Sequence, residues 1–450
     1  MRSDWQTKRL GEVAENISRP FDFKNKTKVI FINTGDVLEG KLLHQTYTNV
    51  NKLPGQAKKA IKKGDILYSE IRPGNKRYLL VDFECEDFVV STKFMVIRPI
   101  GITSEFLYLK LISNEVEDEF KMVADSRSGT FPQITFESIA YYPIKYPINK
   151  IQKAIAKLGF DFIYKIANNN RINQTLEQIA QALFKSWFVD FDPVKAKIQA
   201  KAQGKDPQLA AMEAISGKTA VETQGFASPE YDELRATADL FPDQLVESEL
   251  GLMPEGWILK PLYETAEYVN GGAFKSKDFS ESKEGLPIIK IAELKSGISA
   301  QTKYTSKEMP EKYRINNDDM LYSWSGSPET SLEVFKWYGG QGWLNQHIFK
   351  INTENIEQKV FVYYLLKFLK PQLIQIAKNK QTTGLGHVTV ADMKRMQVVM
   401  PNDSSYQLIT DNFISLFEQA SNCMKQNSVL SLQRDTLLPK LLSGAITTNL

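Results

Sequence analysis

The sequence predicts an α+β fold of two tandem α/β domains separated by two long helices, which form an intramolecular antiparallel coiled coil with pseudo-twofold symmetry. Three observations predict it. Short motifs recur in the same order about 254 residues apart, each half mixes β-rich runs with one helical segment, and each half ends in a long heptad pattern. We divide the chain into a first domain (1–148), a first long helix (149–192), an acidic connector (193–256), a second domain (257–403) and a second long helix with a tail (404–450).

The repeat is visible in pairs of motifs. "DILYS" begins at Asp65 and "DMLYS" at Asp319, and each follows a similar leader, "IKKG" or "INND". The same offset aligns "VSTKFMVI" with "LNQHIFKI" and "ITFESI" with "VTVADM", and "W-x4-L-G-E-V-A" aligns with "W-x4-L-Y-E-T-A". Several matches in one order at a nearly constant offset, 252 for the tryptophan motif and 254 for the others, indicate an internal duplication rather than chance.

Each copy contains the ingredients of a mixed domain. Runs such as "KVIFIN" and "KFMVIRP" have the β-branched and aromatic composition of strands. "SEFLYLKLISNEVEDEFKMVA" in the first copy and "EQKVFVYYLLKFLKPQLIQIA" in the second have the length and period of one helix each. Each half is therefore expected to be an α+β domain.

A heptad pattern follows each domain. Apolar side chains alternate steps of four and three residues, which is the period of a coiled-coil seam. The predicted seam consists of Ile155, Leu158, Phe162, Asn169, Ile172, Leu176, Ile179, Leu183, Phe413, Leu416, Asn427, Leu430, Leu437 and Leu441. Asn169 and Asn427 on this seam are either a polar pair that sets the register or solvated interruptions.

The stretch between the copies differs in charge from the rest. Residues 192–256 carry six Lys/Arg and twelve Asp/Glu, which leaves 50 against 41 elsewhere and places the basic excess in the two large halves. Such an excess suits a surface that faces phosphates, and it is equally compatible with ordinary solvated lysines. Asp192-Pro193 is expected to end the first long helix, and "PQLAAMEAI" is expected to form a short helix in a connector that docks a partner.

Composition bounds the class of protein. The chain of 450 residues is 42% hydrophobic and 24% charged, with no apolar run near the length that crosses a bilayer and no apolar signal core in "MRSDWQTKRLGEV". Two cysteines and three histidines show no disulfide or metal-ligand spacing. We therefore expect a cytoplasmic protein with no membrane association, no metal and no cofactor of its own.

Three stretches together resemble a known family. "QIAQALFKSWFVDFDPVKAK" and "DLFPDQLVESELGLMPEGW" are similar to the central conserved region of specificity subunits of type I restriction-modification systems. "LQRDTLLPKLLSGAI" is similar to their distal conserved region, and the resemblance extends over essentially the whole chain.

The resemblance implies a function. It implies that the two domains are target-recognition domains, each reading one half-site of a bipartite, asymmetric target in double-stranded DNA with a fixed unread spacer. It further implies a non-catalytic subunit that recruits two methyltransferase subunits, which bind S-adenosylmethionine, and two ATP-dependent restriction subunits.

The residues give no sign of catalysis. The sequence contains no Asn/Asp-Pro-Pro-Tyr/Phe tetrapeptide and no "GxxxxGK[ST]" loop, and "NGGAF" at Asn270 has the composition of a turn rather than of a cofactor loop. Asp65, Glu70 and Arg72 suggest a nuclease site, but the second copy has Trp324 and Gly326 where Glu70 and Arg72 stand. A self-sufficient DNA-modifying enzyme and a coiled-coil scaffold without a DNA role remain the alternatives.

The candidate DNA contacts lie in three loops of each copy. They are the loop after "LYS", the tight turns "STK" and "NQH", and the segments "DSRSGTF" and "KNKQTTGLGH", which precede or contain Gly turns. Their basic, amide, hydroxyl and aromatic side chains suit phosphates or base edges. The predicted DNA-binding residues are Arg72, Lys76, Arg77, Lys93, Arg127, Trp324, Ser325, Ser327, Asn345, Gln346, His347, Lys378, Lys380 and Thr383. Trp324 fits a core position equally well.

Overall fold

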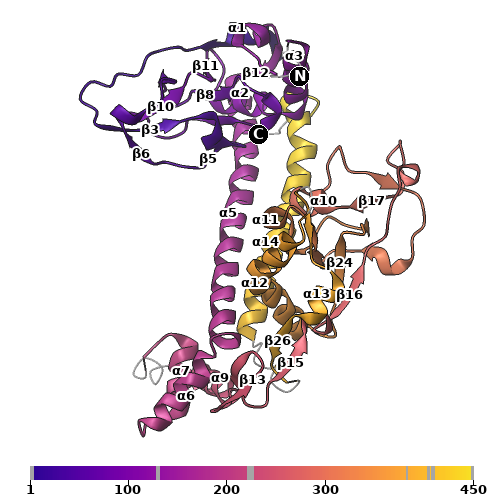
Figure 1. The fold of residues 1–450 in the computed structure, drawn as a ribbon. Helices are drawn as coiled ribbons and strands as arrows, with labels where there is room; N and C mark the ends of the chain where they lie inside the picture. Colours follow the sequence, from indigo (N-terminus) through magenta and orange to yellow (C-terminus); the bar gives the residue numbers. More distant parts are fainter. Residues whose placement is uncertain are drawn as a thin grey trace. The chain divides into compact units, whose positions relative to one another are not determined.

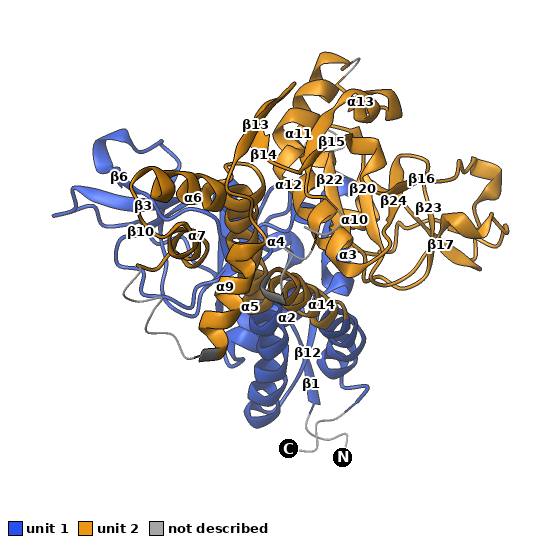
Figure 2. Cartoon of the chain, turned by 90° about the horizontal axis from the view of Figure 1, so that it is seen from below, with its two compact units in different colours: residues 1–166, 429–450 blue, residues 167–428 orange. Residues whose placement is uncertain are grey.

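The chain forms two compact units. One consists of residues 1–166 and 429–450 and the other of residues 167–428, as Figure 2 shows in blue and orange. The structure is a computed structural model that describes residues 5–127, 132–219, 228–381, 384–402, 406 and 411–446. Two long helices, α5 (Asn149–Phe188) and α14 (Asp411–Ser443), contribute residues to both units.

The first domain contains two four-stranded sheets. One has the order β2-β11-β8-β9 and is antiparallel throughout, with β2 (Ala14–Asn16), β11 (Phe94–Pro99), β8 (Ile66–Ser69) and β9 (Tyr78–Leu80). The other has the order β6-β3-β10-β7, with β6 (Tyr47–Asn49), β3 (Lys28–Ile32), β10 (Phe88–Ser91) and β7 (Ala57–Ala60), and its β3 and β10 are parallel. β1 (Trp5–Arg9) pairs with β12 (Pro143–Pro147), and β4 (Val37–Leu38) pairs with β5 (Lys41–Leu42).

The second domain repeats this topology. Its first sheet has the order β16-β24-β20-β22, with β16 (Glu267–Asn270), β24 (Ile348–Asn352), β20 (Met320–Ser323) and β22 (Glu333–Lys336). Its second has the order β18-β17-β23-β19, with β18 (Tyr304–Thr305), β17 (Leu286–Ile289), β23 (Gly342–Leu344) and β19 (Arg314–Ile315), and its β17 and β23 are parallel. β15 (Ile258–Pro261) pairs with β26 (Gln397–Met400) as β1 pairs with β12. The internal duplication is confirmed.

The two recurring pentapeptides fold alike. β8 and β20 are fully buried strands, and each follows a turn in which the aspartate side chain accepts a 2.8 Å hydrogen bond from the backbone N–H three residues earlier. The residue before each aspartate has positive φ, 92° at Gly64 and 73° at Asp318. Asp65 is also bound by both Nε and Nη2 of Arg98, at 2.7 and 2.8 Å. These aspartates therefore hold turns in place, and both carboxylate oxygens of Asp65 are used within the fold.

The helical segments differ between the copies. The single helix expected in the first copy is wrong, because the chain forms α2 (Ser104–Leu111) and α3 (Asn114–Arg127) with a break at Ile112 and Ser113. The second copy has one helix, α12 (Ile356–Asn379), which continues through Pro371. Short helices complete the domains: α1 (Leu10–Val13), α4 (Phe136–Ile139), α10 (Ile291–Ser296), α11 (Pro328–Ser331) and α13 (Val390–Arg395).

In the first unit, α5 and α14 meet through leucines and a glycine. Ile155 and Leu441 belong to one buried cluster, against which Leu158 packs. A Cβ atom on Gly159 would lie 2.5 Å from Leu109 of α2 and 3.3 Å from Leu438 of α14, so a larger residue here would displace these leucine side chains.

In the second unit, α5 and α14 run antiparallel. Asn169 lies against Asn427, and further along α5 Trp187 lies against Phe413, with ring centroids 5.1 Å apart. Figure 1 shows α5 in magenta and α14 in yellow as long unbroken helices. The pairing of the two long helices is confirmed.

The predicted seam is wrong in part. Ile172, Ile179 and Leu437 are exposed, by 38%, 45% and 36% respectively. The other predicted seam residues are buried or half-buried, namely Ile155, Leu158, Phe162, Asn169, Leu176, Leu183, Phe413, Leu416, Asn427, Leu430 and Leu441.

A second partner explains the shift in α5. Its buried face after Asn169 follows Glu177, Ala180, Phe184 and Trp187, one residue later than the predicted positions. Phe184 packs against Phe361 of α12 at a centroid distance of 5.3 Å, so α5 lies on α12 as well as on α14. Between Asn169 and Glu177 the buried face advances by two steps of four residues instead of one of three and one of four. This shift places the large aromatic side chains inside, where they bury more apolar area than Ile172 and Ile179 would.

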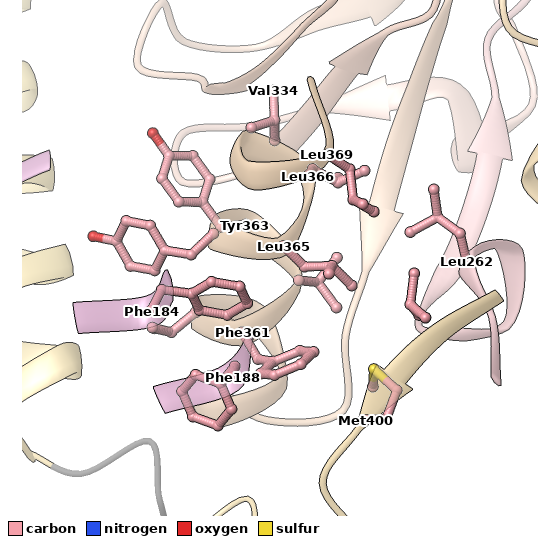
Figure 3. Close-up of a cluster of buried hydrophobic side chains, with 14 of the residues drawn as sticks. Phe184, Phe188, Leu262, Val334, Phe361, Tyr363, Leu365, Leu366, Leu369 and Met400 are labelled. Atoms are coloured by element: carbon pink, nitrogen blue, oxygen red, sulfur yellow. The ribbon is translucent and has the colours of Figure 1, made fainter. Parts of the chain in front are cut away.

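The core of the second unit joins the long helix to the second domain. Figure 3 shows Phe184 and Phe188 of α5 lying against Phe361 of α12, with Leu262 and Met400 nearby. Phe188 meets Phe361 edge to face at 5.3 Å. Aromatic pairs of this geometry are favourable beyond the area that they bury.

The connector contains more regular secondary structure than the one predicted short helix. It contains α6 (Asp192–Ala202), α7 (Pro207–Ser216), α9 (Ser228–Asp239) and a hairpin of β13 (Leu245–Ser248) and β14 (Gly251–Pro254). The expected helix at "PQLAAMEAI" is α7. Asp192-Pro193 does not end the first long helix: α5 ends at Phe188, and Pro193 lies in the first turn of α6, where a proline needs no hydrogen-bond donor. Within the described residues, no helix is both long and apolar enough to cross a membrane.

Candidate nucleic-acid interface

Three loops of the first domain converge at the end of β8. The backbone N–H of Glu70, the first residue after β8, donates to the carbonyl of Lys93 in the β10–β11 turn, at 3.0 Å. The N–H of Ile134 donates to the carbonyl of Glu70 at 2.9 Å, and the N–H of Arg72 donates to that of Pro132 at 2.9 Å. The loop after "LYS", the "STK" turn and the chain before "ITFESI" are thus fixed to one another.

The second domain makes the same connections. The N–H of Trp324 donates to the carbonyl of His347 at 3.3 Å, and the N–H of Val388 donates to that of Trp324 at 2.9 Å. The short strand β21 (Ser325–Gly326) pairs with β25 (Gly386–His387), just as Ile71 pairs with Gln133 in the first copy. In the second domain the three predicted segments are thus joined. In the first domain residues 132–134 take the third place, and residues 128–131 of "DSRSGTF" lie outside the described residues. The joined residues of the two domains are equivalent at a separation of 254 positions.

The first loop holds an unusual backbone. Arg72 and Lys76 flank the 3-10 turn Pro73–Asn75 with φ angles of 46° and 55°, a left-handed conformation that non-glycine residues seldom adopt. Such conformations concentrate at binding sites, where the surrounding structure imposes them. The Arg72 side chain is exposed, and Lys76 lies 3.6 Å from Glu39.

The other basic residues of the first domain differ in freedom. Arg77 uses its Nη1 to bond the carbonyls of Gly35 and Val37, at 3.2 and 2.7 Å, so this guanidinium ties the chain together. Lys93 is exposed at the tip of the β10–β11 turn. Arg127 is the last residue of α3, and its side chain lies outside the described part of the structure.

In the second domain the predicted residues form an aromatic and amide cluster. The Trp324 indole donates to Oδ1 of Asn270 at 3.1 Å and lies 5.7 Å from the His347 ring. Trp324 also packs against the core, as the alternative interpretation predicts, and its contact with DNA stays a prediction. Asn345 is buried, whereas Gln346 and His347 are exposed, and burial of part of its ring lowers the pKa of His347.

The predicted hydroxyl and lysine residues of the second domain differ in their surroundings. Ser325 is half-buried in β21, and Ser327 is the exposed residue that precedes α11. Lys378 forms an ion pair of 2.6 Å with Glu329. Lys380 bonds both carboxylate oxygens of Asp392, which lowers the pKa of that carboxyl against the effect of burial. Thr383 lies outside the described residues.

Sequence reasoning missed two members of these clusters. Asn270 holds Trp324, and the glycines after it are needed because a Cβ on Gly271 would collide with the backbone of Asn345. The turn expected at "NGGAF" is not observed: Asn270 ends β16 and Gly272 forms a bridge with Asn345, so the glycine pair marks a close approach of two backbone segments. Glu70, half-buried beside Lys93, was considered only as a nuclease residue.

Each copy of the repeat matches a known domain family. The model of the type I restriction modification DNA specificity domain matches residues 2–178 and 254–429, one match for each copy. The chain is 40% identical to the specificity subunit of the type I restriction enzyme HindI of Haemophilus influenzae, over 99% of this chain and 100% of that one. The chain belongs to the family of type I restriction-modification specificity subunits.

More distant specificity subunits support the assignment. The MjaIX specificity subunit of Methanocaldococcus jannaschii is 24% identical over 77% of this chain and 70% of its own. The crystal structure of the S subunit of a type I restriction-modification system from M. genitalium superposes with a TM-score of 0.52 at 14% identity, covering 97% of this chain and 96% of that one. That likeness shows the shared fold. The resemblance inferred from the conserved stretches is confirmed.

Proposed function

We propose that this specificity subunit reads a bipartite, asymmetric DNA target, with one half-site for each domain and a fixed unread spacer between them. Residues 1–148 and 257–403 are the two recognition domains of this proposal. The chain carries no chemistry itself, and it assembles with two methyltransferase subunits and two ATP-dependent restriction subunits in the cytoplasm.

One observation carries the proposal. Both domains gather the same three loops by the same backbone hydrogen bonds, but the side chains at equivalent positions differ: Glu70 corresponds to Trp324, and Lys93 to His347. Two related domains that bind different base sequences need the same backbone arrangement with different side chains at equivalent positions. A target of two unlike halves follows from this.

The long helices supply a reason for a fixed spacer. α5 is a single helix of 40 residues, which at 1.5 Å per residue is about 60 Å long. A helix of that length, paired with α14, is stiff enough to set the number of base pairs between two half-sites, and one turn of DNA is about 34 Å.

The proposal is tested by assembling the chain with the methyltransferase subunit of its own system and sequencing the methylated DNA. Two short, unlike motifs at a constant separation are the expected product. The isolated chain is expected neither to bind S-adenosylmethionine nor to methylate or cleave DNA. Methyl transfer by the chain alone would instead support a self-sufficient enzyme, and absence of any DNA binding by the complex would support a scaffold.

A further inference from the structure

Two pairs of equivalent positions in the two domains carry different side chains, which are charged in the first domain and aromatic in the second. Glu70 and Lys93 are joined by a backbone hydrogen bond of 3.0 Å, and Trp324 and His347 are joined by the corresponding bond of 3.3 Å. The backbone frame is therefore the same, and the difference between the two sites lies in these side chains.

The first domain presents one acceptor and one donor. Glu70 is half-buried, and within the described residues its carboxylate makes no hydrogen bond and no ion pair within 4 Å. Burial raises the pKa of Glu70, while the charges of Lys59 and Lys93 act in the opposite direction. Lys59 is itself buried and donates to the carbonyl of Phe94 at 2.6 Å, so its ammonium is a fixed charge behind the site. Lys93 is exposed, and its ammonium is available to a ligand.

The second domain presents no charge at these positions. The indole N–H of Trp324 is already used by Asn270, and one part of the ring packs against Phe349 and the core, so the remaining exposed part of the ring is what a ligand can contact. Burial of part of the ring lowers the pKa of His347, which favours the neutral imidazole. The pair offers an apolar ring next to a neutral hydrogen-bonding group.

The edges of DNA base pairs complement the two arrangements. In the major groove a C·G pair presents the cytosine N4 amino group as donor and guanine O6 and N7 as acceptors. A T·A pair presents the thymine methyl group, with adenine N7 and N6 beside it. A carboxylate next to an ammonium matches the first edge, and an aromatic ring next to a neutral imidazole matches the second.

We propose that Glu70 and Lys93 read a C·G base pair in the half-site of the first domain, and that Trp324 and His347 read a T·A base pair at the equivalent place in the other half-site. This assignment rests on the proposed function. Glu70 accepts a hydrogen bond from cytosine, Lys93 donates to guanine, the Trp324 ring covers the thymine methyl group, and His347 bonds adenine.

The test uses the chain assembled with its methyltransferase subunit. The target is first read from methylated DNA produced by the unaltered complex. Binding is then measured on duplexes in which single base pairs of each half-site are exchanged. Glu70→Gln keeps the shape of the side chain but adds an amino group, and it is expected to reduce discrimination at one C·G pair of one half-site by about 5- to 100-fold.

Lys63→Ala is the matched control. Lys63 lies in the turn before β8, at the opposite end of the strand from Glu70, and its ion pair with Glu84 is exposed. This variant is expected to keep both half-sites. His347→Ala is expected to relax a T·A pair of the other half-site only, so each variant contains an unaltered half-site that reports on correct folding.

The outcomes separate two failures. If the unaltered complex yields no target of two halves, the proposed function is wrong. If it yields such a target but Glu70→Gln leaves discrimination unchanged in both halves, or if neither half contains a C·G pair sensitive to this variant, the assignment of Glu70 and Lys93 is wrong and the proposed function stands. If His347→Ala changes discrimination at no T·A pair of the second half-site, the assignment in the second domain is wrong.

Discussion

Asn169 of α5 donates a hydrogen bond of 3.0 Å to Asn427 of α14, and its side chain is 1% exposed. Asn427 in turn donates to Asn170 at 2.8 Å, and Gln426 lies 3.3 Å from Asn169. Of the two interpretations of these asparagines on the seam, the interhelical pair is the observed one. An amide pair in a mostly apolar seam favours one register, because a slip leaves the buried amide of Asn169 without its partner.

The first prediction concerns this pair. Asn169→Leu leaves the amide of Asn427 facing an apolar side chain and is expected to destabilise the chain by about 1–2 kcal/mol. Adding Asn427→Leu is expected to recover that loss, because both polar partners are then gone. Chemical denaturation of the full chain measures both effects, with the exposed Asn168→Leu as control. Equal effects of Asn168→Leu and Asn169→Leu would contradict the role of the pair.

The second prediction concerns a buried lysine. Lys336 lies 3.6 Å from Glu177, which also accepts a 2.9 Å hydrogen bond from the hydroxyl of Tyr363. Burial lowers the pKa of Lys336 to about 8, against the attraction of Glu177 and with a contribution from Lys367 and Lys359. Because the folded state then binds fewer protons than the unfolded state between pH 8 and 10.5, Lys336 makes stability rise with pH in that window.

Lys336→Met isolates this effect. The stability of the unaltered chain relative to Lys336→Met is expected to increase from pH 8 to pH 10.5, by an amount on the order of 2–3 kcal/mol, and to be constant below pH 7. Denaturation midpoints of both proteins across this range provide the measurement. If the stability of the unaltered chain relative to Lys336→Met stays constant or decreases as the pH rises, burial does not lower the pKa of Lys336.

The third prediction separates two arginines in one loop. Arg77 bonds the carbonyls of Gly35 and Val37, so Arg77→Ala is expected to destabilise the first domain by about 1–3 kcal/mol. Arg72 is exposed, so Arg72→Ala is expected to change stability less than Arg77→Ala does and to lower the salt dependence of DNA binding by about one counterion. Thermal unfolding and binding titrations at several salt concentrations distinguish them. The idea fails if Arg72→Ala unfolds the domain while Arg77→Ala changes only DNA binding.

The fourth prediction concerns the spacer. Seven residues inserted after Ala167 in α5, matched by seven after Ser428 in α14, preserve the heptad and add about 10 Å to each helix. The unread spacer is expected to grow by about three base pairs while both half-site sequences stay the same. Sequencing of DNA methylated by the assembled variant gives the answer. An unaltered spacer with altered bases would refute a ruler made of these helices.

Much of the fold was predictable from residue patterns. The recurring "DILYS" and "DMLYS" motifs form equivalent strands because the same turn and the same buried apolar face precede and line them. The seam failed at Ile172 and Ile179 because a heptad pattern predicts one partner helix, whereas α5 also packs against α12 through Phe184. A second partner of this kind leaves no local signal in the sequence of α5.

The candidate site was predictable as loops but not as side chains. Repetition of "LYS" and its neighbours indicated which segments come together, and the hydrogen bonds of Glu70 and Trp324 join those segments. Composition alone did not show that Arg77 and Lys380 are used within the fold. Arg77 bonds the carbonyls of Gly35 and Val37, and Lys380 bonds the carboxylate of Asp392. Such contacts depend on tertiary structure, and a basic residue in a loop looks the same in either role.

The central claim is that each domain reads one half of the target. Its most direct test is sequencing of DNA methylated by the complete complex, once with the unaltered chain and once with Lys93→Ala. If each domain reads one half, the unaltered chain gives a motif of two unlike halves at a fixed separation, and Lys93→Ala relaxes bases of one half alone. A single continuous motif, or relaxation of both halves by Lys93→Ala, would contradict it.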